Sequence, residues 1–328
     1  MTLSLRYLGR SEAIAAGAKA PDLAIADVRA VVALMRMGKA GMVPEAVLSM
    51  GADPRDKAYA LPAFVAGDYD AAGLKWAVHR AGAAGDLPSI TNATLVNRLS
   101  TGRPVGIVES ALLTRMRTAA VSCLAIETLL PGPPRRVAIL GAGAQAHTHL
   151  EVLSARFASI DSIRIWNRSA ETAAALAARA HAGSARVEPA ASISAAIEDA
   201  DVVLTCTNAT EPLLDATAVR RGRLIVQVGY HEVAFAAIDA SDVVACDLWG
   251  TFAATSAKSL FQMHRAGRFP ADRIAADLAS LVVDGWRPPM GASTYFSSFG
   301  LNVFDIALAA RVLRRAEASS IGSILPFV

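Results

Sequence analysis

The chain has 328 residues, of which 53% are hydrophobic and 19% charged, with a formal net charge of +3 and three cysteines. That length suits two domains, each able to bury a sizeable core. Lysine and arginine are dispersed rather than gathered in a basic block, so nucleic acid is not an expected partner. The cysteines have neither disulfide nor metal-ligand spacing, so no metal is expected. No secretory leader or membrane-spanning run is seen, which indicates a cytoplasmic protein.

The first 125 residues do not alternate strands with helices. A strand is expected at residues 3–8, and apolar residues with helical spacing follow from Asp22. Short apolar runs separated by Gly, Asp and Pro then predict strands of a mixed sheet, with a hairpin turn at residues 101–104. These runs are residues 42–48, 59–65, 73–78, 94–97 and 105–108.

A long helix is expected over residues 114–130, and it ends at the proline cluster that begins with Pro131. Beyond this cluster, strand-like and helical patterns alternate, which predicts a doubly wound parallel sheet. The expected strands are residues 137–140, 163–166, 202–206, 224–228 and 243–246, and a last helix spans residues 302–319. The fold class is therefore α/β, with a Rossmann-type sheet preceded by a second domain.

A glycine-rich turn follows the first of these strands. Gly141 and Gly143 stand one residue apart and a helical pattern begins at once, which is the context in which backbone N–H groups hold a pyrophosphate. Ala146 replaces the third glycine of the usual fingerprint and is small enough for close packing. The segment predicts dinucleotide binding, against the alternative of a merely structural turn.

The next strand indicates which dinucleotide is bound. It ends at Asn167, Arg168 and Ser169, without the acidic residue that accepts bonds from the ribose 2′-hydroxyl of NAD. A guanidinium pairs with a 2′-phosphate, whereas a carboxylate repels it. We therefore expect NADP(H) rather than NAD(H), although Arg168 can also be a solvated residue at a helix start.

Polar residues follow two later strands at the edge where an open α/β sheet binds its ligands. Thr207 and Asn208 come after one strand, and Val228, Gly229 and His231 close the next. A histidine such as His231 suits proton transfer, although a lone histidine beside a glycine more often caps or packs.

Two candidate substrate groups precede the proline cluster. Lys75 stands in an apolar strand, where desolvation makes a lysine usable in acid–base chemistry, although alternate strand positions also carry surface lysines. Arg115 and Arg117 stand with threonines near a helix start and suggest an anion site. The alternative is that these arginines pair with structural carboxylates.

Five segments, taken in order, resemble the ornithine cyclodeaminase/mu-crystallin family over nearly the whole chain. They are Gly73-Leu-Lys75-Trp, Thr101-Gly102-x-Pro104, Arg117-Thr118-Ala119-Ala120, Gly141-Ala-Gly143-Ala-Gln145-Ala146 and Phe299-Gly300-Leu-Asn-Val-Phe-Asp305. The resemblance implies an NADP-binding Rossmann domain over residues 126–300. It also implies an α+β substrate-binding and dimerisation domain built from residues 1–125 and 301–328.

The same resemblance implies that Lys75 contacts the reacting amine or carbonyl and that Arg117 binds the substrate carboxylate. Together with the strand ends, it gives an expected set of nucleotide-binding residues. These are Thr118, Gly141, Gly143, Gln145, Ala146, Asn167, Arg168, Ser169, Thr207, Asn208, Val228, Gly229 and Gly300.

The chain departs from the cyclodeaminases at two places. They carry an aspartate after the strand that ends in glycine, where this chain has Tyr230, His231 and Glu232, and an arginine soon after a proline, where it has Pro44 followed by Glu45. Both departures point away from ornithine and toward another amino or imino acid, such as one with a second polar arm.

We therefore expect a homodimeric, NADPH-dependent reductase, or the reverse dehydrogenase, acting on the C–N bond of a small-molecule α-imino or α-amino acid. Lys75 and His231 are its expected catalytic residues. Two alternatives stay open. One is a cyclodeaminase that releases ammonia with bound cofactor and no net redox change. The other is an NADPH-loaded binding protein of crystallin type without turnover.

Overall fold

The computed structural model describes residues 3–53, 55–81, 88–180 and 185–328. The chain forms two compact units, the first made of residues 1–117 and 301–328 and the second of residues 118–300. The first division falls between Arg117 and Thr118 inside helix α3 (Ala111–Leu129), upstream of the predicted boundary at residues 125 and 126.

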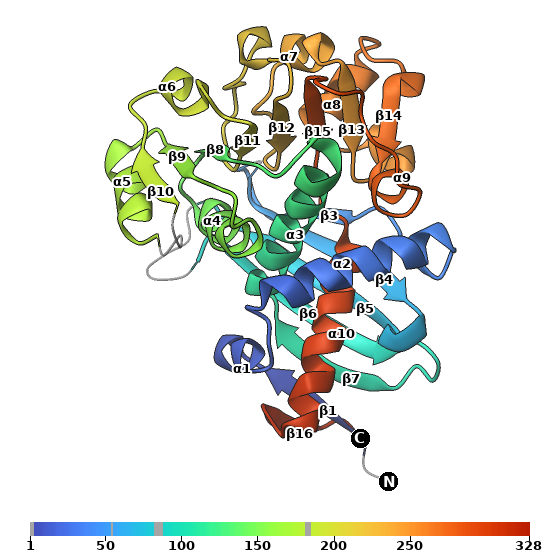
Figure 1. Cartoon of the computed structure of the whole chain (residues 1–328). Coiled ribbons are helices and arrows are strands. Elements are labelled where there is room, and N and C mark those ends of the chain that lie inside the picture. Colours follow the sequence, from blue (N-terminus) through green and yellow to red (C-terminus); the bar gives the residue numbers. More distant parts are fainter. Residues whose placement is uncertain (1–2, 54, 82–87, 181–184) are drawn as a thin grey trace. The chain divides into compact units, whose positions relative to one another are not determined.

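The first unit pairs one sheet with helices on one of its faces (Figure 1). Its strands are β1 (Ser4–Leu8), β2 (Ala40–Met42), β3 (Ala46–Ser49), β4 (Lys57–Val65), β5 (Ala71–His79), β6 (Ile90–Arg98), β7 (Pro104–Glu109) and β16 (Ser323–Pro326). Its helices are α1 (Arg10–Ala15), α2 (Pro21–Arg36) and α10 (Asn302–Ala318). The predicted strand at residues 42–48 is two strands, because Pro44 has no N–H to donate to a ladder.

The sheet runs in the order β16-β1-β7-β6-β5-β4-β2, with β3 also pairing with β4. Neighbours from β7 to β2 are antiparallel, and a turn at Gly102, where φ is +72°, joins β6 to β7 as predicted. Helix α10 packs across β4, β5 and β6 and lies beside α2 (Figure 1). The side chains of Lys75, Ala77 and Thr94 point to this helix-covered face and are buried there.

The opposite face of the same sheet is apolar and exposed. Phe64, Trp76 and Leu95 come from three neighbouring strands and are 37%, 41% and 37% exposed. The pairing register places all three on one face, because Trp76 pairs with Ala93, Leu95 with Leu74, and Phe64 with Ala72. Tyr7 of β1 is 44% exposed and lies on the same face, because Tyr7 pairs with Ile107 of β7 and Ile107 pairs with Leu95.

The second unit is a doubly wound, all-parallel sheet, which confirms the predicted fold class. Its strands are β8 (Arg136–Leu140), β9 (Ser162–Trp166), β10 (Arg186–Pro189), β11 (Val202–Thr205), β12 (Leu224–Gln227), β13 (Val243–Cys246), β14 (Ile274–Asp277) and β15 (Thr294–Ser297). Its helices after α3 are α4 (Ala144–Arg156), α5 (Ala170–Ala178), α6 (Ile193–Ile197), α7 (Phe235–Ala240), α8 (Ser259–Arg265) and α9 (Leu278–Val282).

The strand order in this unit is β10-β9-β8-β11-β12-β15-β13-β14. The chain winds outward in one direction from β8 to β10 and in the other from β11 onward, so the order reverses between β8 and β11. A switch point of this kind opens a crevice at the carboxyl ends of the strands, where such folds bind ligands. None of the helices in the described residues is long and apolar enough to cross a membrane.

Candidate active site

The first unit buries Lys75 against helix α10. Only 4% of Lys75 is exposed, and its Nζ donates to Oδ2 of Asp305 at 2.9 Å. Gly73 allows this approach, because a Cβ there would lie 2.4 Å from the carbonyl oxygen of Leu95 and 3.0 Å from Cδ1 of Ile306 on α10. The glycine two residues before the lysine therefore lets the helix that carries Asp305 reach the strand that carries Lys75.

Asp305 is fully buried and accepts from two further side chains. The Nε of Arg117 donates to Oδ2 at 3.2 Å, and Oγ1 of Thr114 donates to Oδ1 at 2.6 Å. Both donors lie on the first turns of α3, and Nδ2 of Asn92 donates to Thr114 at 3.3 Å. Lys75, Arg117 and Asp305 thus form a buried cluster of two cations around one carboxylate, which we call the Asp305 cluster.

The electrostatics of the Asp305 cluster favour exchange of a proton at Lys75. Burial lowers the pKa of the Lys75 ammonium and the Arg117 charge adds to this, while Asp305 opposes both. Burial acts to raise the pKa of Asp305, but the charges of Arg117 and Lys75 outweigh it and hold that pKa below its ordinary value. Asp305 therefore stays ionised beside a lysine that gives up its proton more easily than one in water.

The sequence interpretation placed Lys75 and Arg117 as functional and left Asp305 unassigned. Asp305 stood at the end of a motif, but its contact with a strand 230 positions away in the chain follows only from the packing of α10. Arg117 pairs with the buried carboxylate of Asp305, which agrees with one of the two interpretations that the sequence left open. Its role as an anion site stays a prediction.

The glycine-rich turn lies where β8 passes into α4. At Gly141 φ is +111°, and a Cβ would lie 2.5 Å from the carbonyl oxygen of Cys206, so the backbone requires glycine. Gly143 caps α4 with an ordinary φ of −86° and is exposed, and a Cβ there would meet no atom within 4 Å. No atom of the protein would therefore clash with a side chain at position 143. An anion that approaches the N-terminus of the helix does require the glycine, because a side chain would block its close approach to the backbone N–H groups.

The neighbours of the turn fit the same ligand. Ala146 is fully buried, and Gln145 has a buried Oε1 atom without a hydrogen-bond partner in the described structure. His149 anchors α4 internally, with Nδ1 2.8 Å from the carbonyl oxygen of Gln145 and Nε2 3.0 Å from Oγ of Ser122. Burial lowers the pKa of His149 to about 4, so this histidine is neutral. Thr118 is buried four residues before Ser122 on the same helix.

The predicted ribose-phosphate residues follow β9. Ser169 caps α5, and its side chain accepts from the N–H of Thr172, while Nδ2 of Asn167 donates to the carbonyl oxygen of Ser169. Arg168 is exposed and makes no hydrogen bond or ion pair within the described residues. Its guanidinium therefore stands in solvent at the carboxyl end of β9.

Glu232 organises the carboxyl ends of β11 and β12. It is fully buried and accepts from Oγ1 of Thr205 at 2.7 Å and from the N–H and Oγ1 of Thr207. A Cβ at Gly229 would lie 2.4 Å from this carboxyl group, so Gly229 is needed for its close approach. Burial raises the pKa of Glu232, and the threonine hydrogen bonds act against that rise. Asn208, which directly follows Thr207, is exposed.

A second buried lysine at this edge was missed by the sequence analysis. Lys258 donates through Nζ to the carbonyl oxygens of Val228 and Gly229, and its Nζ lies 5.2 Å from the centroid of the Tyr230 ring. Asp247, also buried, accepts from the N–H of Gly300 at 2.8 Å. No motif marks these two residues, because each acts on backbone groups of a segment distant in the sequence.

His231 lies half-buried beside α8. Its Nδ1 is 3.2 Å from Oγ of Ser259, and its ring meets that of Phe235 edge-on, with centroids 6.2 Å apart. These contacts orient the ring from one side. In the described parts of the chain, no group of three or more His, Cys, Asp or Glu residues is placed to hold a metal ion.

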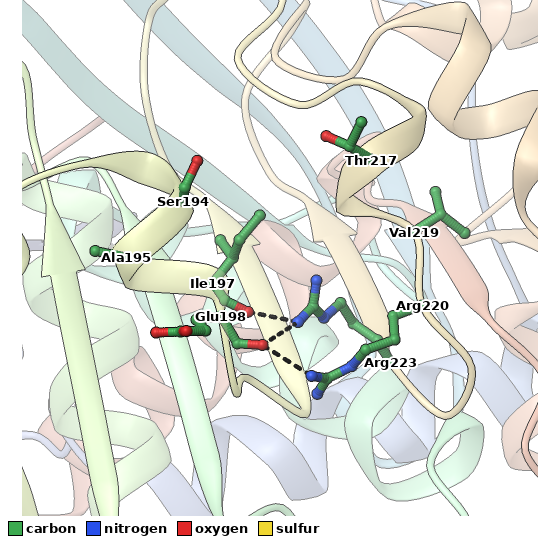
Figure 2. Close-up of a pocket in the computed structure, with 8 residues that line it drawn as sticks. All are labelled: Ser194, Ala195, Ile197, Glu198, Thr217, Val219, Arg220 and Arg223. Carbon is green, nitrogen blue, oxygen red and sulfur yellow. Dashed lines mark hydrogen bonds between the residues drawn. The ribbon is translucent and has the colours of Figure 1, made fainter.

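A pocket of about 440 Å³ lies near the C-terminus of α6 and is not part of this site; Figure 2 shows the side chains that line it. Its two arginines face backbone carbonyl groups, with Arg223 donating to Ile197, Glu198, Ala200 and Ala218, and Arg220 donating to Glu198 and Ala200. The pocket lies near the amino end of β12, since Arg223 directly precedes that strand. Carbonyl groups thus engage the cations that would otherwise mark an anion site.

A Rossmann-type sheet with a glycine-rich turn before α4, in a chain that also buries a lysine beside an arginine, defines an NAD(P)-dependent oxidoreductase. Comparison with known proteins gives the family. The model of the ornithine cyclodeaminase/mu-crystallin family matches residues 18–320, and the chain belongs to this family.

Among curated relatives, the chain is 30% identical over 241 residues to the NAD(P)H-dependent anabolic L-arginine dehydrogenase of Pseudomonas aeruginosa, covering 70% of this chain and 74% of that protein. It is 33% identical over 227 residues to the ketimine reductase mu-crystallin of Macropus fuliginosus, covering 69% of each chain. A solved structure of the Δ1-pyrroline-2-carboxylate reductase of Thermococcus litoralis, in complex with NADH and L-proline, has the same fold. Its TM-score is 0.88 at 22% identity, with 97% of this chain and 99% of that chain covered.

Proposed function

We propose that this protein is an NADPH-dependent reductase, or the reverse dehydrogenase, that acts on the carbon–nitrogen bond of an α-imino or α-amino acid. The observation that carries the proposal is the Asp305 cluster, in which a desolvated lysine and an arginine share one buried carboxylate. The names of the relatives support it, since they include an L-arginine dehydrogenase and ketimine reductases.

In the proposed mechanism the first unit binds and protonates the substrate. Arg117 pairs with the substrate carboxylate and holds the imine carbon in one orientation, which lowers the entropic part of the barrier. Lys75 donates its proton to the imine nitrogen, because a protonated imine accepts a hydride far better than a neutral one. Asp305 holds both cations in place. His231 is the proposed second proton-transfer group.

The second unit is proposed to hold the cofactor. The turn at Gly141 and Gly143 and the N-terminus of α4 bind the diphosphate, with Gln145 and Ala146 beside it. The proposed nucleotide contacts further along the chain are Thr118, Asn167, Arg168, Ser169, Thr207, Asn208, Val228, Gly229 and Gly300. The reduced nicotinamide supplies the hydride when it is bound.

We propose NADP(H) rather than NAD(H) because of Arg168. Arg168→Asp should weaken NADPH binding by about 10- to 100-fold, since a charge-assisted pair becomes a repulsion, and should leave NADH binding nearly unchanged. Titration of the nucleotide fluorescence measures both affinities. Arg179→Asp, further along the same β9-to-β10 connection, is the matched control. Equal NADPH affinities before and after the Arg168 change would contradict the assignment.

We also propose that the protein is a homodimer, joined by the exposed sheet face of the first unit. Phe64, Trp76, Leu95 and Tyr7 form an apolar patch of a kind that usually marks an interface. Trp76→Glu should convert the dimer to monomers in analytical ultracentrifugation, because a desolvated charge opposes association. Met290→Glu, at a 90% exposed residue of the second unit, should leave the dimer intact. A monomeric wild-type protein would contradict this part of the proposal.

The test of the function is nicotinamide absorbance with NADPH or NADH and a panel of cyclic and linear α-imino acids, with ammonia measured in parallel. Oxidation of NADPH by one substrate class supports the reductase. Release of ammonia from an amino acid without net redox change would indicate a cyclodeaminase instead. Tight NADPH binding without turnover would indicate a binding protein.

The proposal also places the enzyme in the cytoplasm, where the buried free thiols of Cys123, Cys206 and Cys246 stay reduced.

A further inference from the structure

The last residue of β12, Gln227, is fully buried and takes part in three hydrogen bonds. Its Nε2 donates to the carbonyl oxygen of Tyr230 at 2.9 Å and to Oγ of Ser259 at 3.1 Å, and its Oε1 accepts from the hydroxyl of Tyr295. Burial raises the pKa of Tyr295, so this hydroxyl keeps the proton that it donates. A carbonyl oxygen accepts and never donates, so the amide of Gln227 has to turn its N–H groups toward Tyr230 and Ser259.

The orientation of this amide fixes the hydroxyl hydrogen of Ser259. Ser259 is fully buried at the first position of α8, and its Oγ accepts from Gln227 and lies 3.2 Å from Nδ1 of His231. Since Gln227 already supplies a hydrogen on one side, the hydroxyl directs its own hydrogen at Nδ1, which accepts it. A neutral imidazole carries a single N–H. The hydrogen of the neutral His231 ring is therefore on Nε2.

His231 is the member of this hydrogen-bond chain that reaches solvent. Tyr295, Gln227 and Ser259 are fully buried, whereas His231 is half-buried. Its Nε2 makes no hydrogen bond within the described residues and is not one of their buried polar atoms without a partner, so it is open to solvent. A network that served stability alone would end on groups satisfied within the protein. This one ends on an open N–H just beyond the carboxyl end of β12, the edge where Rossmann-type sheets bind ligands.

We propose that Gln227 is a positioning residue of the reaction, which fixes His231 through Ser259 so that the ring donates to the substrate from Nε2. The inference rests on the function proposed above and specifies the atom through which His231 acts. Neutral His231 then offers a hydrogen at Nε2 and takes none up there. Uptake of a proton from the substrate in the dehydrogenase direction is left to Lys75.

A change of one atom in Gln227 should reverse the hydrogen-bond chain. The carboxylate of Gln227→Glu has no N–H, so it accepts from the hydroxyl of Ser259 instead of donating to it. The hydroxyl then has no hydrogen for Nδ1 of His231 and accepts from it, which moves the ring hydrogen from Nε2 to Nδ1. The carbonyl oxygen of Tyr230 keeps a donor in the N–H of Ser259, which lies 2.9 Å away.

Nitrogen-15 NMR of the whole protein with labelled histidine measures the position of the hydrogen, in alkaline buffer where a histidine ring is neutral. The signals of His231 are assigned by their loss in His231→Leu. The wild type should show a protonated Nε2 and a bare Nδ1, and Gln227→Glu should show the reverse. Ser259→Ala removes one oxygen atom and should bring the two shifts together, because both forms then exchange. Gln262→Glu, at a half-buried position of α8, is the matched control and should show the wild-type pattern.

Turnover tests whether the position of the hydrogen matters to the reaction. Gln227→Glu and His231→Leu should each lower kcat by about 10- to 100-fold, the effect of one hydrogen bond to a charged group. The two changes together should cost no more than His231→Leu alone, because Gln227 acts through His231. Gln262→Glu should leave kcat unchanged.

The NMR measurement needs no turnover, so it separates this inference from the proposed function. A hydrogen on Nε2 that Gln227→Glu moves to Nδ1, in a protein that turns over no amino or imino acid, supports the positioning by Gln227 and overturns the reductase. A hydrogen on Nδ1 in the wild type, or one that Gln227→Glu does not move, overturns the positioning and leaves a measured reductase activity standing. If Gln227→Glu does not fold, unchanged shifts in Ser259→Ala overturn it. Full turnover in Gln227→Glu with the hydrogen on Nδ1 overturns donation from Nε2.

Discussion

Lys75→Met is expected to reduce turnover to background while nucleotide binding stays as in the wild type. Methionine fills nearly the same volume but has no proton to donate, so the imine nitrogen remains neutral. General acid catalysis of this kind contributes about 10²- to 10⁴-fold, and loss of the substrate contact adds to it. Stopped-flow absorbance with the substrate found in the panel measures turnover, and nucleotide fluorescence titration measures binding.

The matched control is Lys57→Met, which removes a half-buried lysine from β4, the strand next to β5. It should turn over normally. The wild type should also lose activity in the reductive direction as the pH rises through the pKa of Lys75, which burial holds below its ordinary value, because the unprotonated amine cannot act as the acid. Unchanged turnover in Lys75→Met would remove Lys75 from the mechanism.

Asp305→Asn is expected to have the largest effect on stability among changes at the site. The amide leaves the buried cations of Lys75 and Arg117 without a counter-charge, and breaking a buried pair in this way costs about 3–5 kcal/mol of unfolding free energy. Misplacement of both cations should also lower turnover by about 10²-fold. Urea unfolding and steady-state kinetics measure the two effects, and Asp68→Asn, at an exposed position of the same unit, is the control.

The stability effect of Asp305 should depend on pH with a definite sign. The folded-state pKa of Asp305 is held below its ordinary value, so its charge stabilises the fold above the unfolded pKa of about 3.9 and ceases to do so as the pH falls through the lower folded value. The difference between wild type and Asp305→Asn should therefore be full at neutral pH and shrink in acid. A difference that stays constant into acid would contradict an electrostatic role.

The sequence predicted most of the fold because its signals are local. Alternation of apolar runs and helical patterns after Pro131 was enough to predict the parallel sheet, and β8, β9, β11, β12 and β13 all form where expected. Strand β15 was not predicted, although it lies in the middle of that sheet between β12 and β13. Its four residues follow a segment rich in proline and glycine, and only pairing with strands distant in the sequence defines it.

The residues of the candidate site also fall into two groups, those that a local sequence pattern predicts and those that only the tertiary structure reveals. The sequence by itself determined the glycine turn, since Gly141 and Gly143 act through the backbone of their own segment, and it marked Lys75 and Arg117 as residues to test. Only the tertiary structure decided that Asp305 joins those two cations and that Lys258 holds the carbonyl groups of Val228 and Gly229. These contacts bridge residues far apart in the chain and depend on strand register and helix packing, which no local pattern encodes.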